Sequence, residues 1–444
     1  MGFPVKYNIH TKGRIHMNTT ELKNKLSNGE YSEKLAYMYA CDKNETKKYA
    51  DRYLEVIDGF EKNFGKADEL RLFSAPGRTE IGGNHTDHQH GCVLAASLNL
   101  DVIGAAKLNG TNKVRIQSKG YPMDEIDLDN LDVQESEREK AASLIRGILK
   151  KFSDKGYKLQ GFDAYTLSSV LKGSGMSSSA AFEVLVGNIV NSMFANGEVD
   201  AVEIAKIGQF AENVYFGKPS GLMDQMASSV GAVVAIDFAD TEKPVINKVD
   251  FDFTKSGHAL CIIDSGADHA DLTSEYAGIT VEMKKVSEFF GKNYLREVDP
   301  TEFNARLKEV REAVNDDRAI LRAIHFFNDN QTAQDEVESL KNDDFESFCD
   351  MIKKSGRSSY MYLQNVYAAS MPHQQAVSLA LALCDEILGE NGAYRVHGGG
   401  FAGTVQAFVP NDMLDEFKTK MEAVLGEGMC HVLSIRPVGG CELV

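Results

Sequence analysis

The sequence predicts an α/β protein with two domains, and three observations support this prediction. The chain has 444 residues, which is more than one average hydrophobic core accommodates. Its content of 43% hydrophobic and 25% charged residues is typical of a globular protein and not of a disordered one. Runs with strand character also alternate with helical patterns along most of the chain.

The elements of the first half follow one another in a clear order. Residues 1–16 lack periodicity, whereas residues 20–66 are rich in Lys, Glu, Tyr and Leu and predict helices. A buried strand is expected at residues 93–108, and an alternating strand at residues 113–118. Residues 139–152 form an amphipathic helical pattern, whose apolar side is expected to carry Leu144, Ile145, Ile148 and Leu149.

Further strands and helices are expected downstream. Residues 161–171 favour a strand and residues 179–194 a helix, while residues 232–238 and 259–266 read as buried strands. The charged stretch at residues 239–257 is our candidate for an inter-domain region.

Two patterns in the last third also predict local structure. Asp299 is expected to cap a helix that has Pro300 in its first position, with Glu302 reaching back to the cap. Residues 393–410 predict two strands joined by a glycine-rich hairpin.

Charge and cysteine content narrow the class of protein. The net charge is 48 − 65 = −17, so the surface repels nucleic acid and anionic lipid. The seven cysteines include no CxxC pair, which favours buried thiols in a reducing compartment. No apolar run approaches the about 20 residues that span a bilayer. We therefore expect a soluble, cytoplasmic protein without a nucleic-acid or membrane partner.

The stretch "LKGSGMSSSAA" at residues 171–181 joins a predicted strand to a predicted helix. The first N–H groups of a helix have no partner within it, and the helix dipole places partial positive charge there. Glycines allow a ligand to approach closely, so this loop can bind phosphate. It lacks the Lys of the GxxxxGK[ST] loop, and a plain serine-capped helix is the alternative.

The stretch "AENVYFGKPSGLMDQM" at residues 211–226 places Glu212 and Asp224 on either side of a turn. Mg²⁺ binds to one or two carboxylates together with phosphate oxygens, a role that suits Glu212. Phosphoryl transfer needs a residue that orients the attacking hydroxyl, a role that suits Asp224. The alternative for Glu212 is a solvated position on a helix face.

The stretch "GRTEIGGNHTDHQHG" at residues 77–91 combines three histidines with charged residues and glycines. Its H-x-x-H-x-H spacing matches neither HExxH nor the known zinc signatures, which argues against a metal site. Asn84, His85 and Asp87 offer donors and acceptors that suit the hydroxyls of a sugar. Arg78 keeps its charge and would strengthen a nearby anion.

Taken together and in this order, the three motifs resemble those of the galactokinases in the GHMP small-molecule kinase superfamily. The family's sugar motif, G-R-x-N-x-I-G-E-H-T-D-Y, is similar to residues 77–88, and its phosphate loop, G-x-G-L-S-S-S-A, to residues 173–180. Its G-I-M-D-Q is similar to residues 221–225, and its late G-G-G-F-G-G to residues 398–403. The resemblance covers roughly residues 66–444.

The resemblance implies a role for each matching residue. Asp224 matches the catalytic aspartate, and Arg78 matches the arginine that keeps this aspartate ionised. Ser179 and Glu212 match the Mg²⁺ ligands. The phosphate loop for ATP would comprise Gly173, Ser174, Gly175, Met176, Ser177, Ser178 and Ser179. The sugar contacts would be Asn84, His85, Thr86, Asp87, Gly221 and Tyr276.

The implied reaction is the ATP-dependent, Mg²⁺-assisted phosphorylation of galactose at its anomeric hydroxyl, which gives galactose 1-phosphate. Galacturonate or another galactose-like sugar is the alternative substrate. A non-catalytic sensor that binds galactose and ATP is a further alternative on the same fold. The expected partners are the sugar and ATP, and the expected state is a monomer or a weak homo-oligomer.

Three departures from the family pattern matter for this reading. Asn84 stands where the family has a Glu, and an amide would tolerate an acidic C6 better than a carboxylate does. The Asp-His-Gln that follows is similar to the galacturonate kinases. The chain has no Trp, although many members carry one near the position of Ala141, so the preference for ATP over GTP rests on the family alone. Ala402 replaces a glycine.

The resemblance also implies the architecture. We expect a two-domain GHMP kinase fold with a ribosomal-protein-like N-terminal domain, a ferredoxin-like C-terminal domain and the active site in the cleft between them. A helical extension is expected at residues 1–65, the first domain with the three motifs at residues 66–250, and the second domain at residues 251–444.

Overall fold

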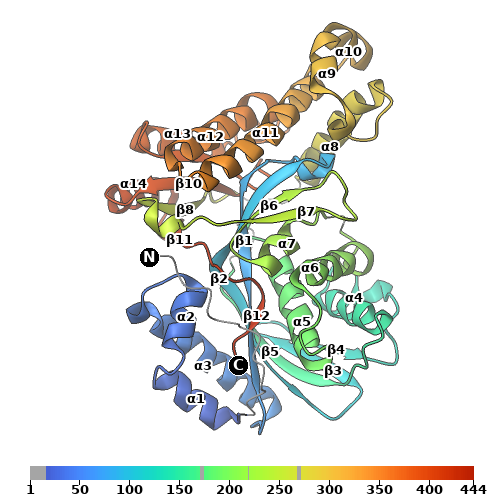
Figure 1. The fold of residues 1–444 in the computed structure, drawn as a ribbon, viewed down its shortest axis with the longest axis vertical. Coiled ribbons are helices and arrows are strands. Elements are labelled where there is room, and N and C mark those ends of the chain that lie inside the picture. The colour runs from blue at the N-terminus through green and yellow to red at the C-terminus, as the bar shows by residue number, and fades with distance from the viewer. Residues whose placement is uncertain (1–16, 171–174, 219, 268–271) are drawn as a thin grey trace.

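The computed structural model describes residues 17–170, 175–218, 220–267 and 272–444. Its elements are arranged around two β-sheets, as Figure 1 shows. The larger sheet has eight strands, of which six follow the order β12-β1-β2-β5-β3-β4, while β6 pairs with β2 and with β7. These strands are β1 (Arg71–Gly82), β2 (Cys92–Leu108), β3 (Lys113–Ser118), β4 (Met123–Asp127), β5 (Phe162–Ser168), β6 (Val233–Asp237), β7 (Val245–Val249) and β12 (Cys441–Glu442).

Three N-terminal helices cover one face of this sheet. They are α1 (Thr19–Ser27), α2 (Ser32–Tyr39) and α3 (Lys47–Phe64), in the region where the sequence predicts helices. Their apolar side chains form one core with residues of β1 and β2, among them Tyr53 from α3 and Ile103 from β2. Residues 17–64 of the extension are therefore packed as part of the molecule, at the lower end of Figure 1.

Five helical segments cover the opposite face of the larger sheet. They are α4 (Ala141–Asp154), α5 (Ser178–Phe194), α6 (Ala201–Phe210), the π-helical turn η4 (Ala211–Phe216) and α7 (Met223–Val230). The apolar side of α4 that the sequence predicts is buried, with Leu144, Ile145, Ile148 and Leu149 at most 4% exposed. Helices α5 and α7 also pack against β1 of the sheet.

The smaller sheet is antiparallel and has the order β11-β8-β10-β9. Its strands are β8 (His258–Asp264), β9 (Ala393–His397), β10 (Thr404–Pro410) and β11 (Cys430–Leu433). The glycine-rich hairpin that the sequence predicts joins β9 to β10, which pair in register from Thr404 and His397 onward. Helices α13 (Ala376–Leu388) and α14 (Leu414–Leu425) share a hydrophobic core with this sheet.

Helices from the middle of the chain complete the upper part of Figure 1. They are α8 (Thr273–Phe289), α9 (Pro300–Ala305), α10 (Leu307–Val314), α11 (Asp317–Lys341) and α12 (Phe345–Ser358). The short turns are η1 (Lys43–Glu45), η2 (Asp87–Gln89), η3 (Glu135–Glu137), η5 (Phe253–Lys255), η6 (Leu295–Glu297) and η7 (Ser359–Leu363). Helix α11 packs against both α8 and α12, and it also contacts β2 of the larger sheet.

Two local predictions need correction. Residues 239–257, our candidate inter-domain region, contain a strand that we did not predict, β7, which pairs with β6 from Val233–Val249 to Asp237–Val245. The cap at Asp299 is confirmed by a hydrogen bond from the Thr301 N–H at 2.8 Å, with Pro300 in the first position. Glu302 does not reach back to the cap, and its carboxylate accepts a hydrogen bond from Arg306 at 3.0 Å.

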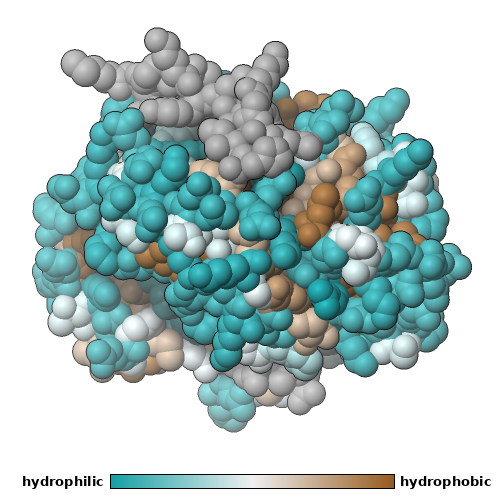
Figure 2. Space-filling view, turned by 90° about the horizontal axis from the view of Figure 1, so that it is seen from below, coloured by the Kyte–Doolittle hydropathy of each residue, from teal (hydrophilic) through white to brown (hydrophobic). Residues whose placement is uncertain are grey.

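Polar residues dominate one face of the molecule. Seen from below Figure 1, the molecule is mainly hydrophilic, with apolar side chains in scattered patches (Figure 2). No helix in the described part of the chain is both long enough and apolar enough to cross a bilayer. The seven cysteines are all free thiols, five of them buried.

Candidate active site

Arg78 and Asp224 meet where the larger sheet contacts the first turn of α7. Arg78 lies in β1 at an irregularity in its pairing with β2, and its Nε lies 2.7 Å from Asp224 Oδ1. The same guanidinium donates a hydrogen bond to the carbonyl of Gly175. The Arg78 side chain is 8% exposed and that of Asp224 is 30% exposed, so the carboxylate remains accessible to a ligand.

The surroundings of Asp224 keep its carboxyl group ionised. Burial on its own would raise the pKa of Asp224, but the charge and hydrogen bond of Arg78 and the Ser177 hydroxyl together hold this pKa below its usual value. The pKa of Arg78 is raised in turn, because the attraction of Asp224 outweighs the cost of burial. The site therefore presents a negatively charged acceptor at neutral pH.

The described part of the phosphate loop leads directly into α5. Gly173 and Ser174 lie outside the described residues, whereas Gly175 and Ser177 have positive φ angles of 69° and 53°. The N–H of Arg78 donates to the Met176 carbonyl at 3.2 Å, which fixes the loop against β1. Helix α5 starts at Ser178 without a side-chain cap. Such a helix start favours phosphate oxygens.

Ser179 and Glu212 lie together beside this helix start. Ser179 Oγ is 3.4 Å from Glu212 Oε1, and the Glu212 side chain is only 4% exposed. The other carboxylate oxygen of Glu212 accepts hydrogen bonds from Ser220 Oγ at 2.6 Å and Gln225 Nε2 at 2.8 Å. Both groups offer the oxygen ligands that Mg²⁺ prefers, so the pair fits this ion together with phosphate oxygens.

The turn at residues 83–88, which lies in the motif at residues 77–91, contacts the loop that precedes α7. Asp87 begins η2, and its Oδ1 accepts a hydrogen bond from the His88 N–H at 2.9 Å. A Cβ atom on Gly221 would lie 2.5 Å from Asp87 Oδ2, closer than any real contact allows. Glycine at position 221 therefore permits the approach of Asp87.

His85 and Tyr276 meet the glycine-rich turn after β9 from two sides. His85 Nε2 lies 2.8 Å from the Gly399 carbonyl, and Tyr276 Oη donates to the Gly400 carbonyl at 2.9 Å. Burial lowers the pKa of His85 to about 4, with a further contribution from His88, and burial raises the pKa of Tyr276 to about 12. Both rings are therefore uncharged at neutral pH, as suits contacts to hydroxyl groups.

Asn84 and Thr86, which we expected among the sugar contacts, are placed differently. Both are fully buried. The Thr86 hydroxyl bonds within its own turn, at 2.8 Å from the Gly83 carbonyl and 2.6 Å from the Cys92 carbonyl. The Asn84 carboxamide donates to Glu80 Oε1 at 2.8 Å and to the Gly398 carbonyl at 2.7 Å. In the structure, both side chains thus bond to groups of the turn and of the segments packed against it.

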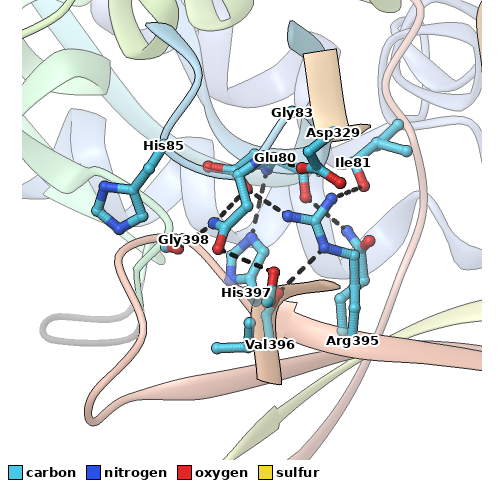
Figure 3. Close-up of polar contacts among 12 residues, drawn as sticks. Glu80, Ile81, Gly83, His85, Asp329, Arg395, Val396, His397 and Gly398 are labelled. Atoms are coloured by element: carbon cyan, nitrogen blue, oxygen red, sulfur yellow. Dashed lines mark hydrogen bonds and ion pairs between the residues drawn. The ribbon is translucent and has the colours of Figure 1, made fainter. Parts of the chain in front are cut away.

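The sequence did not indicate a set of buried polar side chains that pack against the turn. Figure 3 shows four of them, Glu80, Asp329, Arg395 and His397. Arg395 pairs with Glu80 at 2.6 Å, and His397 Nε2 lies 3.0 Å from Thr79 Oγ1. Asp329 accepts a hydrogen bond from the Asn84 N–H at 2.7 Å. One signal was available: Arg395 and His397 alternate with apolar residues in a strand that enters the glycine hairpin.

The histidines of the turn are used separately. His90 stacks on Tyr294 with ring centroids 3.6 Å apart, whereas His85 bonds to the glycine turn. Among the described residues, no group of three His, Cys, Asp or Glu side chains is arranged to hold a metal ion.

Comparison with known proteins identifies the motifs. Residues 58–108 match the galactokinase galactose-binding signature, and residues 143–232 match the GHMP kinases N-terminal domain. A galactokinase of Glaesserella parasuis is 29% identical over 363 residues, which is 81% of this chain and 90% of the relative. A galactokinase of Clostridium tetani is 27% identical over 83% of this chain and 91% of the relative.

Solved structures show the same fold. The galactokinase of Lactococcus lactis, crystallised with galactose, superposes with a TM-score of 0.73 at 24% identity, covering 86% of this chain and 97% of that protein. A mevalonate kinase superposes with a TM-score of 0.59 at 13% identity, covering 82% of this chain and 99% of that protein. The α/β fold is therefore that of the GHMP kinases, and the resemblance to galactokinases is confirmed.

Proposed function

We propose, from the similarity to galactokinases and the geometry of the site, that the chain is a galactokinase that transfers a phosphoryl group from ATP to the anomeric hydroxyl of galactose. The observation that supports this proposal best is the pair of Arg78 and Asp224. It lies between the start of α5, where phosphate is favoured, and the turn that carries Asp87. A reacting hydroxyl between these groups would meet the carboxylate on one side and the phosphate on the other.

Asp224 and Arg78 would act on the attacking hydroxyl. Because its pKa is depressed, Asp224 accepts a hydrogen bond as an anion and orients the hydroxyl oxygen towards the phosphorus. Arg78 holds the carboxylate at 2.7 Å and places a positive charge beside the transferred group. Positioning and electrostatics would supply most of the acceleration.

The remaining site residues would bind the two substrates. The N–H groups at the start of α5, with Gly175, Met176, Ser177 and Ser178, would contact the phosphates of ATP. Ser179 and Glu212 would hold Mg²⁺, which neutralises phosphate charge when it is bound. His85, Asp87, Gly221 and Tyr276 would surround the sugar. Asn84 and Thr86 would support this group from behind.

Galacturonate or another galactose-like sugar is the second candidate substrate. The favouring observation is Asn84, because its carboxamide replaces a carboxylate and bonds to Glu80 and Gly398. A sugar with an acidic C6 would then avoid repulsion from a carboxylate at that position.

We also propose that the chain works in the cytoplasm as a monomer or weak homo-oligomer. The seven free thiols are typical of proteins from a reducing compartment. For the domain division we keep an N-terminal extension at residues 1–65 and a boundary near residue 250, since the smaller sheet begins at His258.

The test is a coupled assay of ADP release with galactose, galacturonate, N-acetylgalactosamine and arabinose, scored by kcat/KM. We expect the highest value with galactose. A higher value with galacturonate would move the assignment to the second candidate. Tight galactose binding in calorimetry without ADP release from any of the four sugars would reject the kinase and support the sensor.

A further inference from the structure

A buried polar cluster joins the turn at residues 83–88 to β9, to the glycine turn at residues 398–400 and to α11. Its centre is formed by Glu80 of β1 and Arg395 of β9, which Figure 3 shows, together with Asn84 of the turn at residues 83–88. Glu80 Oε1 accepts from both Arg395 Nη2 at 2.6 Å and Asn84 Nδ2 at 2.8 Å. Arg395 also donates to the carbonyl of Ile81. None of the three central side chains is more than 6% exposed.

Asn84 connects four separate segments through its side chain and backbone. Its Nδ2 bonds to Glu80 in β1 and to Gly398 in the glycine turn, and its Oδ1 accepts from Asn365 Nδ2 at 2.8 Å. Its N–H donates to Asp329 of α11, and its carbonyl lies 2.9 Å from His325 Nε2 of the same helix. Such a network fixes the backbone of the turn on every side.

The cluster borders two of the residues that we assign to the sugar, His85 and Tyr276. The next residue after Asn84 is His85, whose ring bonds to Gly399. Asn365 Nδ2 bonds to the same Gly399 carbonyl at 3.1 Å, and Gly400 accepts from Tyr276. A change in the centre of the cluster therefore reaches His85 through the backbone and Tyr276 through the glycine turn.

The cluster also contains buried ionisable groups. Burial raises the pKa of Glu80 to about 7, although Arg395 acts against this shift. Glu336 of α11 is also fully buried, and neither of its carboxyl oxygens has a hydrogen-bond partner in the structure. A side chain at Gly82 would overlap this carboxyl group.

We propose that Glu80, Asn84 and Arg395 are positioning residues for sugar binding. They lock the turn at residues 83–88 to the glycine turn at residues 398–400, and so hold His85 and Tyr276 at the spacing that the sugar requires. This inference rests on the proposed function of the site. It adds that the residue replacing the family's Glu acts through its buried hydrogen bonds and not by touching the substrate.

The sequence itself supplies a sharp test of this role. The motif G-R-x-N-x-I-G-E carries an amide at the position of Glu80 and an acid at the position of Asn84. This chain has the two groups exchanged, and here they touch each other at 2.8 Å. Each single change back to the motif should break the pair, whereas the double change should restore one acid and one amide.

The experiment compares Glu80→Asn, Asn84→Glu and the double variant with the wild type. Glu80→Asn removes the partner of a buried arginine, and Asn84→Glu brings a second carboxyl group next to Glu80. We expect each single variant to raise the KM for galactose by about tenfold or more, with the KM for ATP within about twofold. In the double variant, the KM for galactose should return towards the wild-type value by at least half of this rise, measured on a logarithmic scale.

A matched control separates positioning from general destabilisation. Asp101 is another buried acid, paired with Arg52 at 2.6 Å and Arg436 at 3.2 Å under the N-terminal helices. Asp101→Asn should lower the midpoint of urea unfolding and leave the KM for galactose unchanged. Glu80→Gln, which keeps the shape of the side chain, serves if Glu80→Asn fails to fold, and the same KM split is expected of it.

Three outcomes decide the matter. A selective rise in the KM for galactose with recovery in the double variant supports the positioning role. Single variants whose KM for galactose stays unchanged, as is expected of Asp101→Asn, overturn it, and so do single variants in which the KM values for galactose and ATP rise in parallel. Absence of sugar-dependent ADP release from the wild type would reject the proposed function, and galactose affinities from calorimetry would then test the cluster on their own.

Discussion

One carboxylate, Asp224, is expected to contribute most to the chemistry at the scale of single residues. Replacement by Asn keeps the shape but removes the charge that orients the attacking hydroxyl. We predict that Asp224→Asn lowers kcat by about 10²–10⁴-fold with a smaller effect on either KM, as is usual for the loss of a catalytic acid or base. Steady-state assays of sugar phosphate formation measure this effect.

A substitution of Arg78, the partner of Asp224, tests the same role in a second way. Arg78→Leu removes the charge that depresses the pKa of Asp224, so burial would then raise this pKa. The acidic limb of the pH profile of kcat should therefore move to higher pH in Arg78→Leu. A native rate of sugar phosphate formation in either variant would contradict the assigned roles.

Glu80 gives a second prediction at this scale, concerning stability against pH. Its pKa is raised from the usual 4.5 to about 7 in the folded state, where the charged groups around it are Arg395, Asp87 and Arg78. Between these two values the folded state retains a proton that the unfolded state loses. The contribution of Glu80 is thus present below pH 4.5 and is lost as the pH rises through 7.

Urea unfolding of the wild type and Glu80→Gln at several pH values tests this linkage. The free energy of unfolding of the wild type should fall relative to that of Glu80→Gln by up to about 3 kcal/mol as the pH rises across the window. Parallel curves for the two proteins would show that Glu80 does not titrate there.

The site shows which residues a sequence can reveal. Arg78 and Asp224 stand in specific motifs, and the structure brings them together. The motif could not reveal that Asn84 is buried, because its exposure depends on Arg395, Asn365 and Asp329, which follow more than 240 residues later. A contact between distant segments leaves no trace in the local spacing of either one.

At the scale of elements, the loop before α7 and the turn at residues 83–88 depend on a close approach. We predict that Gly221→Ala raises the KM for galactose by about tenfold or more, because the new Cβ would lie 2.5 Å from Asp87 Oδ2 and displace this carboxylate. The KM for ATP should change less. Steady-state kinetics with each substrate varied in turn provide both constants.

Gly278→Ala is the matched control for this substitution. In α8, a Cβ on Gly278 would meet only Arg322 Nη1, at an ordinary distance of 3.7 Å. This variant should keep both KM values and gain slightly in helix stability. Equal kinetics of the two alanine variants would mean that the approach of Asp87 to Gly221 has no part in sugar binding.

Most elements were predictable because apolar periodicity marks them. Strands β2, β3, β5, β6 and β8 and helices α4 and α5 lie where the sequence places them. Strand β7 was missed because it lies at the edge of the sheet, and only Val249 of its five residues is buried. The pattern that follows Asp299 breaks at Arg306 into α9 and α10, although nothing in its periodicity marks this break.

At the scale of the whole molecule, the N-terminal helices and the larger sheet share one hydrophobic core. The sequence predicted the helices but not this sharing, since the faces that pack together belong to segments far apart in the chain. Tyr39 Oη and Arg52 Nη1 each donate to Asp101 at 2.6 Å from α2 and α3. The N-terminal helices thus also supply hydrogen-bond donors for the buried carboxylate of Asp101 in β2.

This arrangement predicts that the extension stabilises the fold without taking part in sugar binding. Tyr53 is fully buried between α3 and the sheet. Tyr53→Ala should lower the free energy of unfolding by about 3–5 kcal/mol, as truncation of a buried aromatic side chain does. The KM for galactose in the folded protein should stay at the wild-type value, because Tyr53 packs in a core separate from the Arg78–Asp224 site.

The control is Tyr121→Ala, which removes a tyrosine that is 48% exposed and should lower the free energy of unfolding by less than about 0.5 kcal/mol. If Tyr53→Ala is as stable as Tyr121→Ala, the shared core does not support the fold; if it instead raises the KM for galactose, the extension communicates with the active site.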